Sequence, residues 1–453
     1  MKLLSLFITV ICFIGCSKKP VSVSLTLENA VVKANDSAEI ICQEQSYRFP
    51  LTEDGKGKVV IPIEKDCFAI LNFKKNSTNI YLKSGDVLEL TWNPKDWKGE
   101  NIKVVSNDGG INAYMRKNIG RAFARGTQGS FMLKESDFMM NVDTTLQSIY
   151  KEIDATEFST EIKDMLKAYS KYSILDWIFL YPRFHNYGKR MTKEEYMSYE
   201  QFNHYMFDQF EERPEYLCLT SYRAYATRWF YELMQLECFS DPYILKKECA
   251  CECILDKVKD SSLKEYLLAS TITPYIQTYG LENAEKIVDC FRTNVHNPMY
   301  VQAFEKNYKV WAKLAPGAPA FNFCYSDING EKVRLSDFKG KYVLIDLWAT
   351  WCKPCCYEIP FVKEIEHRLK DKNIVFVSIS SDKDVEAWKK MVKEEKMGGV
   401  QLNFDRNRDF MNYFYAKSIP RFIIIDPEMK IVNAHAPKPS SGELEKILNE
   451  LLK

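Results

Sequence analysis

The chain has 453 residues, and its 62 basic and 61 acidic side chains leave a formal net charge of +1. This balance excludes the strongly basic surface that is typical of nucleic-acid-binding proteins, so no nucleic-acid partner is predicted. The length predicts about three domains, because single hydrophobic cores rarely grow beyond about 250–300 residues.

The N-terminal residues have the layout of an export signal. Lys2 precedes an apolar run from Leu3 to Ile14, which is too short to span a membrane. Gly15-Cys16 then resembles the lipobox of bacterial lipoproteins, in which the chain is cut before the cysteine and the cysteine carries the lipid. Residues 1–16 are therefore expected to be a lipoprotein-type signal peptide, with lipidation at Cys16 and the chain in the cell envelope, lipid-anchored and facing the periplasm. The alternative is an ordinary secretory signal with Cys16 incidental; either way the chain faces an oxidising compartment.

No later stretch approaches the roughly 20 uninterrupted apolar residues of a membrane span, so no transmembrane helix is predicted. Residues 21–105 instead alternate apolar and polar side chains at strand spacing, as in Val21 to Leu27. Turn-forming residues separate these runs, which predicts a small antiparallel β-sandwich or barrel. The run from Ile80 to Leu90 resembles a strand-turn-strand element in the N-terminal domains of exported thioredoxin-like proteins of the Bacteroidetes type.

The apolar period becomes helical between residues 110 and 313. One face of a predicted helix carries Ile162, Met165, Leu166 and Tyr169. Glycine and proline breaks divide the region into about seven helices, and its many aromatic side chains favour tight helix packing. This region is predicted to be an all-helical domain.

Three alternating cysteines, Cys249, Cys251 and Cys253, lie in this helical region. Alternating cysteines can bind soft metals, but positions two apart on a helix point about 200° away from each other. The three sulfurs therefore cannot converge on one ion. Structural disulfides, with Cys238 and Cys290 as candidate partners, or buried thiols are the favoured interpretation.

Residues 314–320 contain two prolines and a glycine, which is typical of a linker. From residue 318 to 453 the pattern alternates strand and helix, which predicts a sheet covered by helices. The expected strands lie near 331–334, 342–348, 373–380, 421–426 and 430–434, and the expected helices near 354–370, 384–396, 407–415 and 441–452.

A Cys-x-x-Cys motif, Cys352 to Cys355, directly follows the apolar run from Tyr342 to Trp348. A strand that ends in this motif and then opens a helix is typical of a redox site, because the helix N-terminus lowers the pKa of the first thiol. The second sulfur lies close enough to form a disulfide. A zinc site would need two further ligands, and the sequence has no second Cys-x-x-Cys and its nearest histidine is His367. No metal is therefore predicted.

Two motifs of this C-terminal region match a known family. The run from Phe338 to Cys355, followed by Glu358-Ile359-Pro360, resembles the TlpA/ResA-like thioredoxin family, and Ser418 to Asp426 resembles its second signature. The resemblance implies a C-terminal α/β thioredoxin fold, preceded here by the β-sandwich-like domain and the all-helical region. It implies a thiol-disulfide oxidoreductase that uses a redox-active cysteine pair and no other cofactor. Its expected partners are thiols or disulfides of exported proteins and a membrane electron donor or acceptor.

The resemblance also implies roles for individual residues. Cys352 would be the exposed nucleophile and Cys355 the resolving thiol, with a Cys352–Cys355 disulfide in the oxidised state. Trp351 would shield the site and offer a flat docking surface. Pro420 matches the cis-proline of thioredoxin-like folds, and Ile419 would offer its backbone to an extended substrate. The alternative is a trans proline that opens a strand.

Two acids are candidate catalytic groups. Asp346 is the only charge in an apolar strand, so burial is expected to raise its pKa and let it take the proton of Cys355. Glu358 lies one helical turn beyond Cys355 and matches the active-site glutamate of the ResA-like branch; a solvated helix residue is the alternative. Cys356 points about 100° away from Cys355 and is expected to be a bystander.

Two other functions remain to be weighed. A peroxidase of the same fold requires Thr-x-x-Cys, and Thr350-Trp351-Cys352 has the wrong spacing. Peroxidase activity is therefore not predicted. A binding or assembly module with a redox-silent thioredoxin-like domain stays open as the alternative function.

Overall fold

The computed structural model describes residues 19–94, 102–116, 130–179, 181–185, 195, 198, 202, 207–237, 247–404 and 407–453. The predicted signal peptide and Cys16 lie outside these residues. The chain divides into two compact units, Met1–Leu267 and Leu268–Lys453, with the boundary inside α9 (Ser261–Tyr279). None of the helices in the described ranges is long and apolar enough to cross a bilayer.

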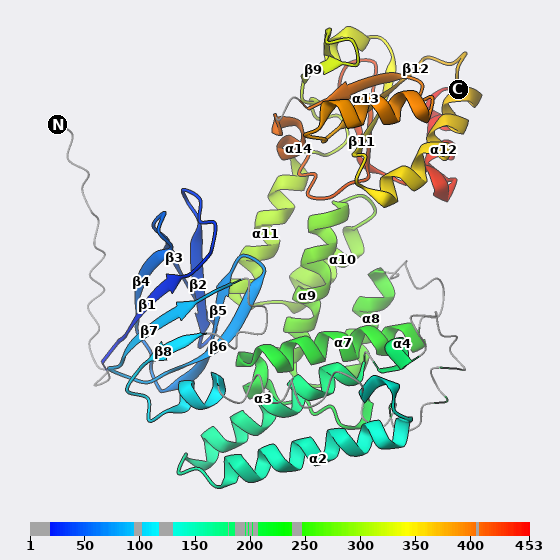
Figure 1. Cartoon of the computed structure of the whole chain (residues 1–453). Helices are drawn as coiled ribbons and strands as arrows, with labels where there is room; N and C mark the ends of the chain where they lie inside the picture. The colour runs from blue at the N-terminus through cyan, green and yellow to red at the C-terminus, as the bar shows by residue number, and fades with distance from the viewer. Residues whose placement is uncertain are drawn as a thin grey trace, which may run out of the picture. The chain divides into compact units, whose positions relative to one another are not determined.

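The first unit begins with two four-stranded sheets that share one core (Figure 1). Strand β1 shows why they form, since Val21, Val23 and Leu25 are buried and alternate with partly exposed polar side chains. The sheet orders are β4-β1-β7-β8 and β3-β2-β5-β6. The strands are β1 (Val21–Leu27), β2 (Ser37–Cys42), β3 (Gln45–Pro50), β4 (Lys56–Ile61), β5 (Cys67–Phe73), β6 (Asn76–Leu82), β7 (Val87–Trp92) and β8 (Lys103–Val105).

The sequence predicted a wholly antiparallel sandwich or barrel, and this prediction needs correction. Strand β1 pairs in parallel with β7, from Ser22 beside Val87 to Leu27 beside Trp92. A parallel pair needs a long connection, and the strands between β1 and β7 in the sequence supply it by crossing to the other sheet and back.

The helical part of the first unit packs around aromatic side chains. The buried ring of Tyr172 contacts Tyr222 edge-on and Tyr225 at a tilt, with centroid distances of 4.9 and 5.3 Å. Met165 and Leu166 are buried on the predicted face of their helix. The elements are η1 (Ser130–Met132), α2 (Glu135–Asp154), α3 (Thr160–Ile178), α4 (Tyr181–His185), η3 (Pro214–Cys218), α7 (Thr220–Glu237) and α8 (Lys247–Lys257).

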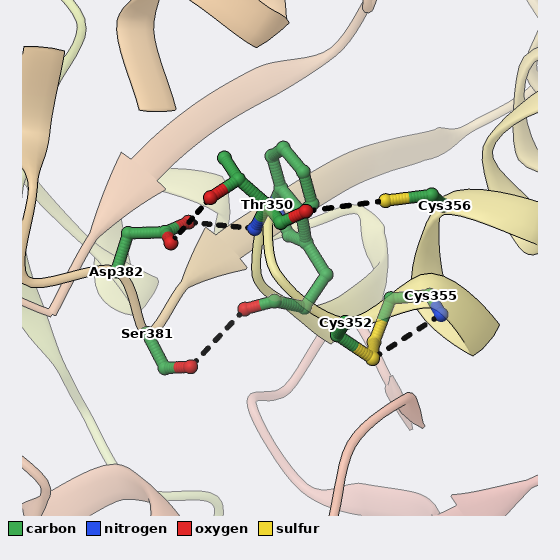
Figure 2. Close-up of a disulfide and its surroundings, with 7 residues drawn as sticks. Thr350, Cys352, Cys355, Cys356, Ser381 and Asp382 are labelled. Carbon is green, nitrogen blue, oxygen red and sulfur yellow. Dashed lines mark hydrogen bonds between the residues drawn. A yellow bond between two sulfur atoms is a disulfide. The ribbon is translucent and has the colours of Figure 1, made fainter. Parts of the chain in front are cut away.

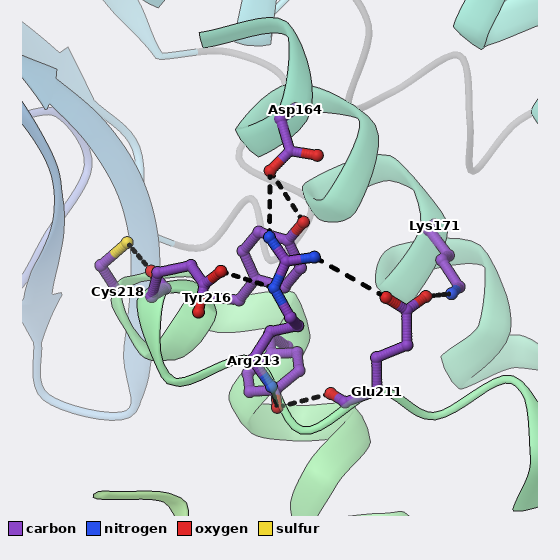
Figure 3. A network of polar contacts seen from close by, with 8 residues as sticks. Asp164, Lys171, Glu211, Arg213, Tyr216 and Cys218 are labelled. Carbon is purple, nitrogen blue, oxygen red and sulfur yellow. Dashed lines mark hydrogen bonds and ion pairs between the residues drawn. The ribbon is translucent and has the colours of Figure 1, made fainter. Parts of the chain in front are cut away.

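An ionic network joins α3 to the segment that enters η3 (Figure 3). The Lys171 ammonium lies 2.7 Å from a Glu211 carboxylate oxygen, and the Tyr216 hydroxyl donates to Asp164 at 2.8 Å. Arg213 reaches the carboxylates of Asp164, Glu211 and Glu215. Because these charges are partly exposed, the network orients the segment more than it stabilises the fold.

The buried side chain of Asn79 joins the sandwich to the helices. Its amide nitrogen donates to the carbonyls of Ala69 and Cys218 at 3.1 and 2.7 Å. Its amide oxygen accepts from the backbone N–H and the hydroxyl of Thr220, both at 2.8 Å. Asn79 on β6 therefore satisfies polar groups at the end of η3 and the start of α7.

Replacing Asn79 by Ala should lower the free energy of unfolding by about 3 kcal/mol, because several buried polar groups lose their partners. Urea denaturation followed by tryptophan fluorescence measures this change. Asn72→Ala is the matched control, since the Asn72 side chain donates one partly buried bond to Glu39 at 3.3 Å and should cost less than about 1 kcal/mol. Equal losses in the two variants would show that Asn79 does not hold this junction.

The cysteine cluster lies on α8. Cys249 takes part in a disulfide, and the side chains of Cys251 and Cys253 are buried. Both observations agree with the expectation of disulfides or buried thiols. In the described part of the chain, no group of three or more His, Cys, Asp or Glu side chains is arranged to hold a metal ion.

The second unit contains a seven-stranded sheet of order β10-β9-β13-β12-β11-β14-β15, which confirms the predicted thioredoxin-like domain. The interior strand β11 runs parallel to β12 and antiparallel to β14. Helices α12 and α15 pack apolar side chains against the sheet. The elements are β9 (Cys324–Asp327), β10 (Lys332–Arg334), η4 (Leu335–Phe338), β11 (Tyr342–Trp348), α12 (Lys353–Arg368), β12 (Ile374–Ser380), α13 (Val385–Glu394), β13 (Val400–Asn403), α14 (Asp409–Tyr413), β14 (Arg421–Ile425), β15 (Ile431–Ala436), η5 (Pro439–Ser441) and α15 (Glu443–Leu451).

Helical residues that precede the predicted linker also belong to this unit. They are the second half of α9, together with α10 (Glu285–Asn294) and α11 (Pro298–Ala312). The Arg421 guanidinium donates to the Thr278 carbonyl at 3.2 Å, and the Tyr415 hydroxyl donates to Asn307 at 2.8 Å. These contacts join the helices to the sheet and to the loop before β14.

Candidate active site

The Cys-x-x-Cys motif lies where the interior strand β11 ends and α12 begins. Cys352 caps this helix, and Pro354 occupies its first turn, where a missing N–H costs no hydrogen bond. Cys352 and Cys355 form a disulfide with their Cα atoms 5.2 Å apart (Figure 2). The Cys355 backbone N–H donates to the Cys352 sulfur at 3.2 Å. The helix N-terminus therefore directs an N–H donor at this sulfur, which stabilises the charged form of a thiol.

Both sulfur-bearing residues are buried in this oxidised state. Cys352 is 6% exposed and Cys355 is 2% exposed, so the expectation of an openly exposed Cys352 needs correction. The two cysteines share an apolar cluster with Trp348, Ile359 and others, and this cluster covers them. Cys352 is nonetheless the more accessible of the pair.

The predicted substrate-side residues border this cluster. Trp351 is 67% exposed beside the disulfide, so its ring is available at the surface. The Ile419-Pro420 peptide bond is cis, and the half-buried side chain of Ile419 packs against the cysteine cluster. The fold thus brings the two sequence motifs together although more than sixty residues separate them.

Asp346 is buried in β11, two residues before the strand ends. Burial raises the pKa of its carboxyl to about 7, and the negative charge of Glu358 adds to the rise. At neutral pH this carboxyl is therefore close to half ionised, which suits a group that takes up and releases a proton.

Glu358 is 4% exposed, so the alternative of a solvated helix residue does not hold. Its carboxylate accepts two hydrogen bonds from Ser440, from the backbone N–H at 3.0 Å and from the hydroxyl at 2.9 Å. Ser440 lies in η5, 82 residues away in the sequence. Sequence reasoning missed Ser440, because no local pattern marks a serine that reaches across the fold.

A second anchoring group that the sequence did not reveal is Asp382. Its carboxylate accepts from the Thr350 backbone N–H at 2.9 Å and from the Thr350 hydroxyl at 2.7 Å (Figure 2). The Cys356 thiol donates to the Thr350 carbonyl at 3.6 Å, and burial raises the pKa of Cys356. Asp382 therefore holds the loop before Cys352, and Cys356 packs against the same loop.

Replacing Glu358 by Gln should lower the pKa of Asp346, because the variant removes the second cause of its elevation while burial remains. We expect a fall of up to about one unit. An NMR titration of the Asp346 carboxyl carbon in the oxidised protein measures it directly. Glu364→Gln, at an exposed position on the same helix, should leave the titration unchanged. An unchanged pKa in Glu358→Gln would show that the two carboxyls do not interact.

Comparisons with known proteins concern this domain. Residues 316–434 match the AhpC/TSA family. The thiol-disulfide oxidoreductase ResA of Bacillus thuringiensis subsp. konkukian is 29% identical over 139 residues, which cover 31% of this chain and 80% of the relative. ResA of Geobacillus thermodenitrificans is 30% identical over 122 residues, which cover 26% of this chain and 67% of the relative.

Among solved structures, the thioredoxin domain of a thiol-disulfide oxidoreductase from Bacteroides vulgatus is 31% identical. The match covers 31% of this chain and 99% of that domain, with a TM-score of 0.29. The family match at residues 316–434 includes the cysteine pair, and both relatives are named thiol-disulfide oxidoreductases. Through this domain, the chain belongs to the ResA/TlpA-like thiol-disulfide oxidoreductases and is an enzyme of that class.

Proposed function

We propose that the chain reduces or exchanges disulfides of exported proteins with the Cys352/Cys355 dithiol, from the periplasmic side of the bacterial cell envelope. The observation that carries this proposal is the cysteine pair at the N-terminus of α12 in the same domain as the buried carboxyl of Asp346. A helix N-terminus favours the thiolate form of Cys352. A base in the same domain favours the attack of Cys355 that resolves the mixed disulfide. The pair itself carries two electrons, so the reaction requires no further cofactor.

The reaction begins with the reduced pair. The Cys352 thiolate attacks one sulfur of the client disulfide, forms a mixed disulfide, and expels the other client sulfur as a thiolate that takes a proton from water. Asp346 then takes the proton of the Cys355 thiol, and the Cys355 thiolate attacks the Cys352 sulfur. This step expels the second client thiolate and closes the Cys352–Cys355 disulfide. The client gains two electrons, and a dithiol donor at the membrane returns them to the enzyme.

The residues around the pair would hold an extended client segment. The exposed ring of Trp351 offers an apolar surface beside the sulfur, and the backbone of Ile419 is the proposed strand-like partner of the client. Pro420 cannot donate a hydrogen bond, so it orients Ile419 without competing for the client backbone. Glu358 acts on the site through the charge that it places near Asp346.

A trapping experiment with oxidised insulin as the model client tests the redox proposal. Cys355→Ser should accumulate a mixed disulfide with insulin, because Cys352 can attack and nothing resolves the adduct. The double variant with Cys352→Ser and Cys355→Ser should accumulate none. A redox-silent binding module would bind insulin without any covalent adduct in either protein, and that result would overturn the proposal.

We further propose that a lipid on Cys16 anchors the chain to the membrane. The support is the lipobox-like sequence at the end of the apolar run. Cells that produce the full chain and are fed labelled palmitate should label the wild type and not Cys16→Ala. Labelling of Cys16→Ala at the wild-type level would contradict it.

A further inference from the structure

The N-terminal sandwich contains a second pair of cysteines, Cys42 and Cys67, which the redox site does not use. Cys42 is the last residue of β2, and Cys67 is the first residue of β5, the neighbouring strand (Figure 1). In the antiparallel pairing of these strands, Ile41 lies opposite Ile70. Continued by one residue, this register sets Cys42 opposite Ala69, and Cys67 follows two residues along β5 on the same face as Ala69. The two side chains are therefore diagonal neighbours on one face of the sheet.

A side-chain clamp holds the two strand ends together. The Gln43 amide nitrogen donates to the Lys65 carbonyl at 2.9 Å, and its amide oxygen accepts from the Glu64 backbone N–H at 3.2 Å. Gln43 and Glu44 both have positive φ, which is the geometry of a tight two-residue hairpin turn. The turn after Cys42 is therefore fixed beside the segment before Cys67.

Both cysteines belong to the core of the sandwich. Cys42 is buried in the sandwich core, and the partly buried side chains of Cys67 and Tyr47 pack against that core. Burial raises the pKa of the Tyr47 hydroxyl, and the charges of Cys42 and Cys67 add to the rise. Tyr47 and Cys67 thus border the core that contains Cys42.

The two thiols differ in their exposure, which suits them to different steps of disulfide formation. The neighbouring Cys67 thiol and burial raise the pKa of Cys42, which is the more buried of the two. Cys67 is also half-buried rather than buried, so a reagent reaches it first. Cys67 therefore has the properties of an attacking thiol, and Cys42 those of a resolving thiol.

The neighbouring thiol of Cys218 is a poor competitor. Burial raises the pKa of Cys218 to about 12, and its S–H donates to the Glu215 carbonyl at 3.3 Å (Figure 3). The Cys218 thiol is therefore protonated and hydrogen-bonded, which makes it a poor nucleophile.

We propose that Cys42 and Cys67 form a second, reversible disulfide that links β2 to β5 when the protein meets a small-molecule disulfide. The Cys67 thiolate attacks oxidised glutathione and releases one glutathione thiolate. The Cys42 thiol then passes its proton to water and attacks the Cys67 sulfur, which releases the second glutathione. Two electrons leave the protein, and one molecule of oxidised glutathione becomes two of reduced glutathione.

Peptide mapping of the full chain tests this proposal independently of the active site. The protein is equilibrated with defined ratios of reduced to oxidised glutathione, its remaining thiols are alkylated, and protease fragments are identified by mass spectrometry. We expect a fragment that links the Cys42 and Cys67 peptides and disappears as the buffer becomes more reducing. The test uses the wild-type chain, so its result does not depend on the folding of a variant. Complete alkylation of both cysteines in oxidised glutathione, or a Cys67–Cys218 link, would overturn the proposal.

Variants separate the roles of the two thiols. Cys42→Ser should leave Cys67 as a mixed disulfide with glutathione, because no second thiol resolves it. Cys67→Ser should leave Cys42 fully alkylatable after denaturation, and Cys218→Ser should keep the link. Because the mapping reads Cys352 and Cys355 on another fragment, failure here and failure of the proposed redox function give different results.

Discussion

Cys352→Ser is expected to lower insulin disulfide reduction by at least about 10³-fold, because the nucleophile and its pair partner act as one unit. Serine keeps the shape of the side chain, but its hydroxyl does not form a stable bond to sulfur. The assay follows insulin precipitation with dithiothreitol at a concentration that is itself slow to reduce insulin. Cys355 is not expected to replace Cys352, because Cys355 is 2% exposed and Cys352 caps α12.

Cys356→Ser is the matched control for this prediction. Cys356 directly follows Cys355, its thiol donates to the Thr350 carbonyl, and burial raises its pKa. A serine hydroxyl can donate to the same carbonyl, so activity should stay within about twofold of wild type. Loss of activity in Cys356→Ser with retention in Cys352→Ser would reverse the assignment of the nucleophile.

Asp346→Asn is expected to lower the rate of insulin reduction about 10²-fold at pH 7, because the resolving thiol loses its base. The wild-type rate should rise as pH increases through about 7, since only the ionised carboxyl accepts a proton. Asp346→Asn should lack this rise. Asp371→Asn, at an exposed position in the same domain, should keep the wild-type profile. A pH profile that Asp346→Asn leaves unchanged would exclude this carboxyl as the base.

Asp346→Asn should also change how the free energy of unfolding depends on pH. The folded-state pKa of Asp346 lies above the ordinary value of 3.8, so the unfolded chain ionises first as pH rises. The free energy of unfolding should therefore fall between about pH 4 and pH 7, by up to about 4 kcal/mol, and then level off. Asp346→Asn removes this fall, so it should stabilise the oxidised protein at pH 8 and have little effect at pH 4. Urea denaturation across this range checks the difference.

Local patterns predicted the centre of the C-terminal domain well. Strand β11, helix α12 and the position of Cys352 at their junction follow from an apolar run that meets a Cys-x-x-Cys and a helical stripe. The burial of Asp346 was also predicted, because an apolar strand of this kind is buried on both faces of a sheet. Strands β9 and β13 were missed, since each has four residues and carries polar side chains.

Contacts between distant residues were beyond sequence reasoning. The bonds from Ser440 to Glu358 and from Arg421 to Thr278 join residues 82 and 143 positions apart. The sequence analysis assigned no role to Cys42 and Cys67, because their proximity depends on the pairing of β2 with β5. Such pairings depend on the register of the whole sheet, which a periodic pattern in one strand does not determine.

A redox titration of the cysteine pair tests the central claim most directly. The full chain is equilibrated with thiol-disulfide buffers, and alkylation of Cys352 and Cys355 is read by mass spectrometry at each potential. The proposed reductase should lose both thiols together in one two-electron transition near the potential of thioredoxin, about −270 mV. Independent oxidation of the two cysteines, or a midpoint near about −120 mV as in a strong oxidant, would contradict it.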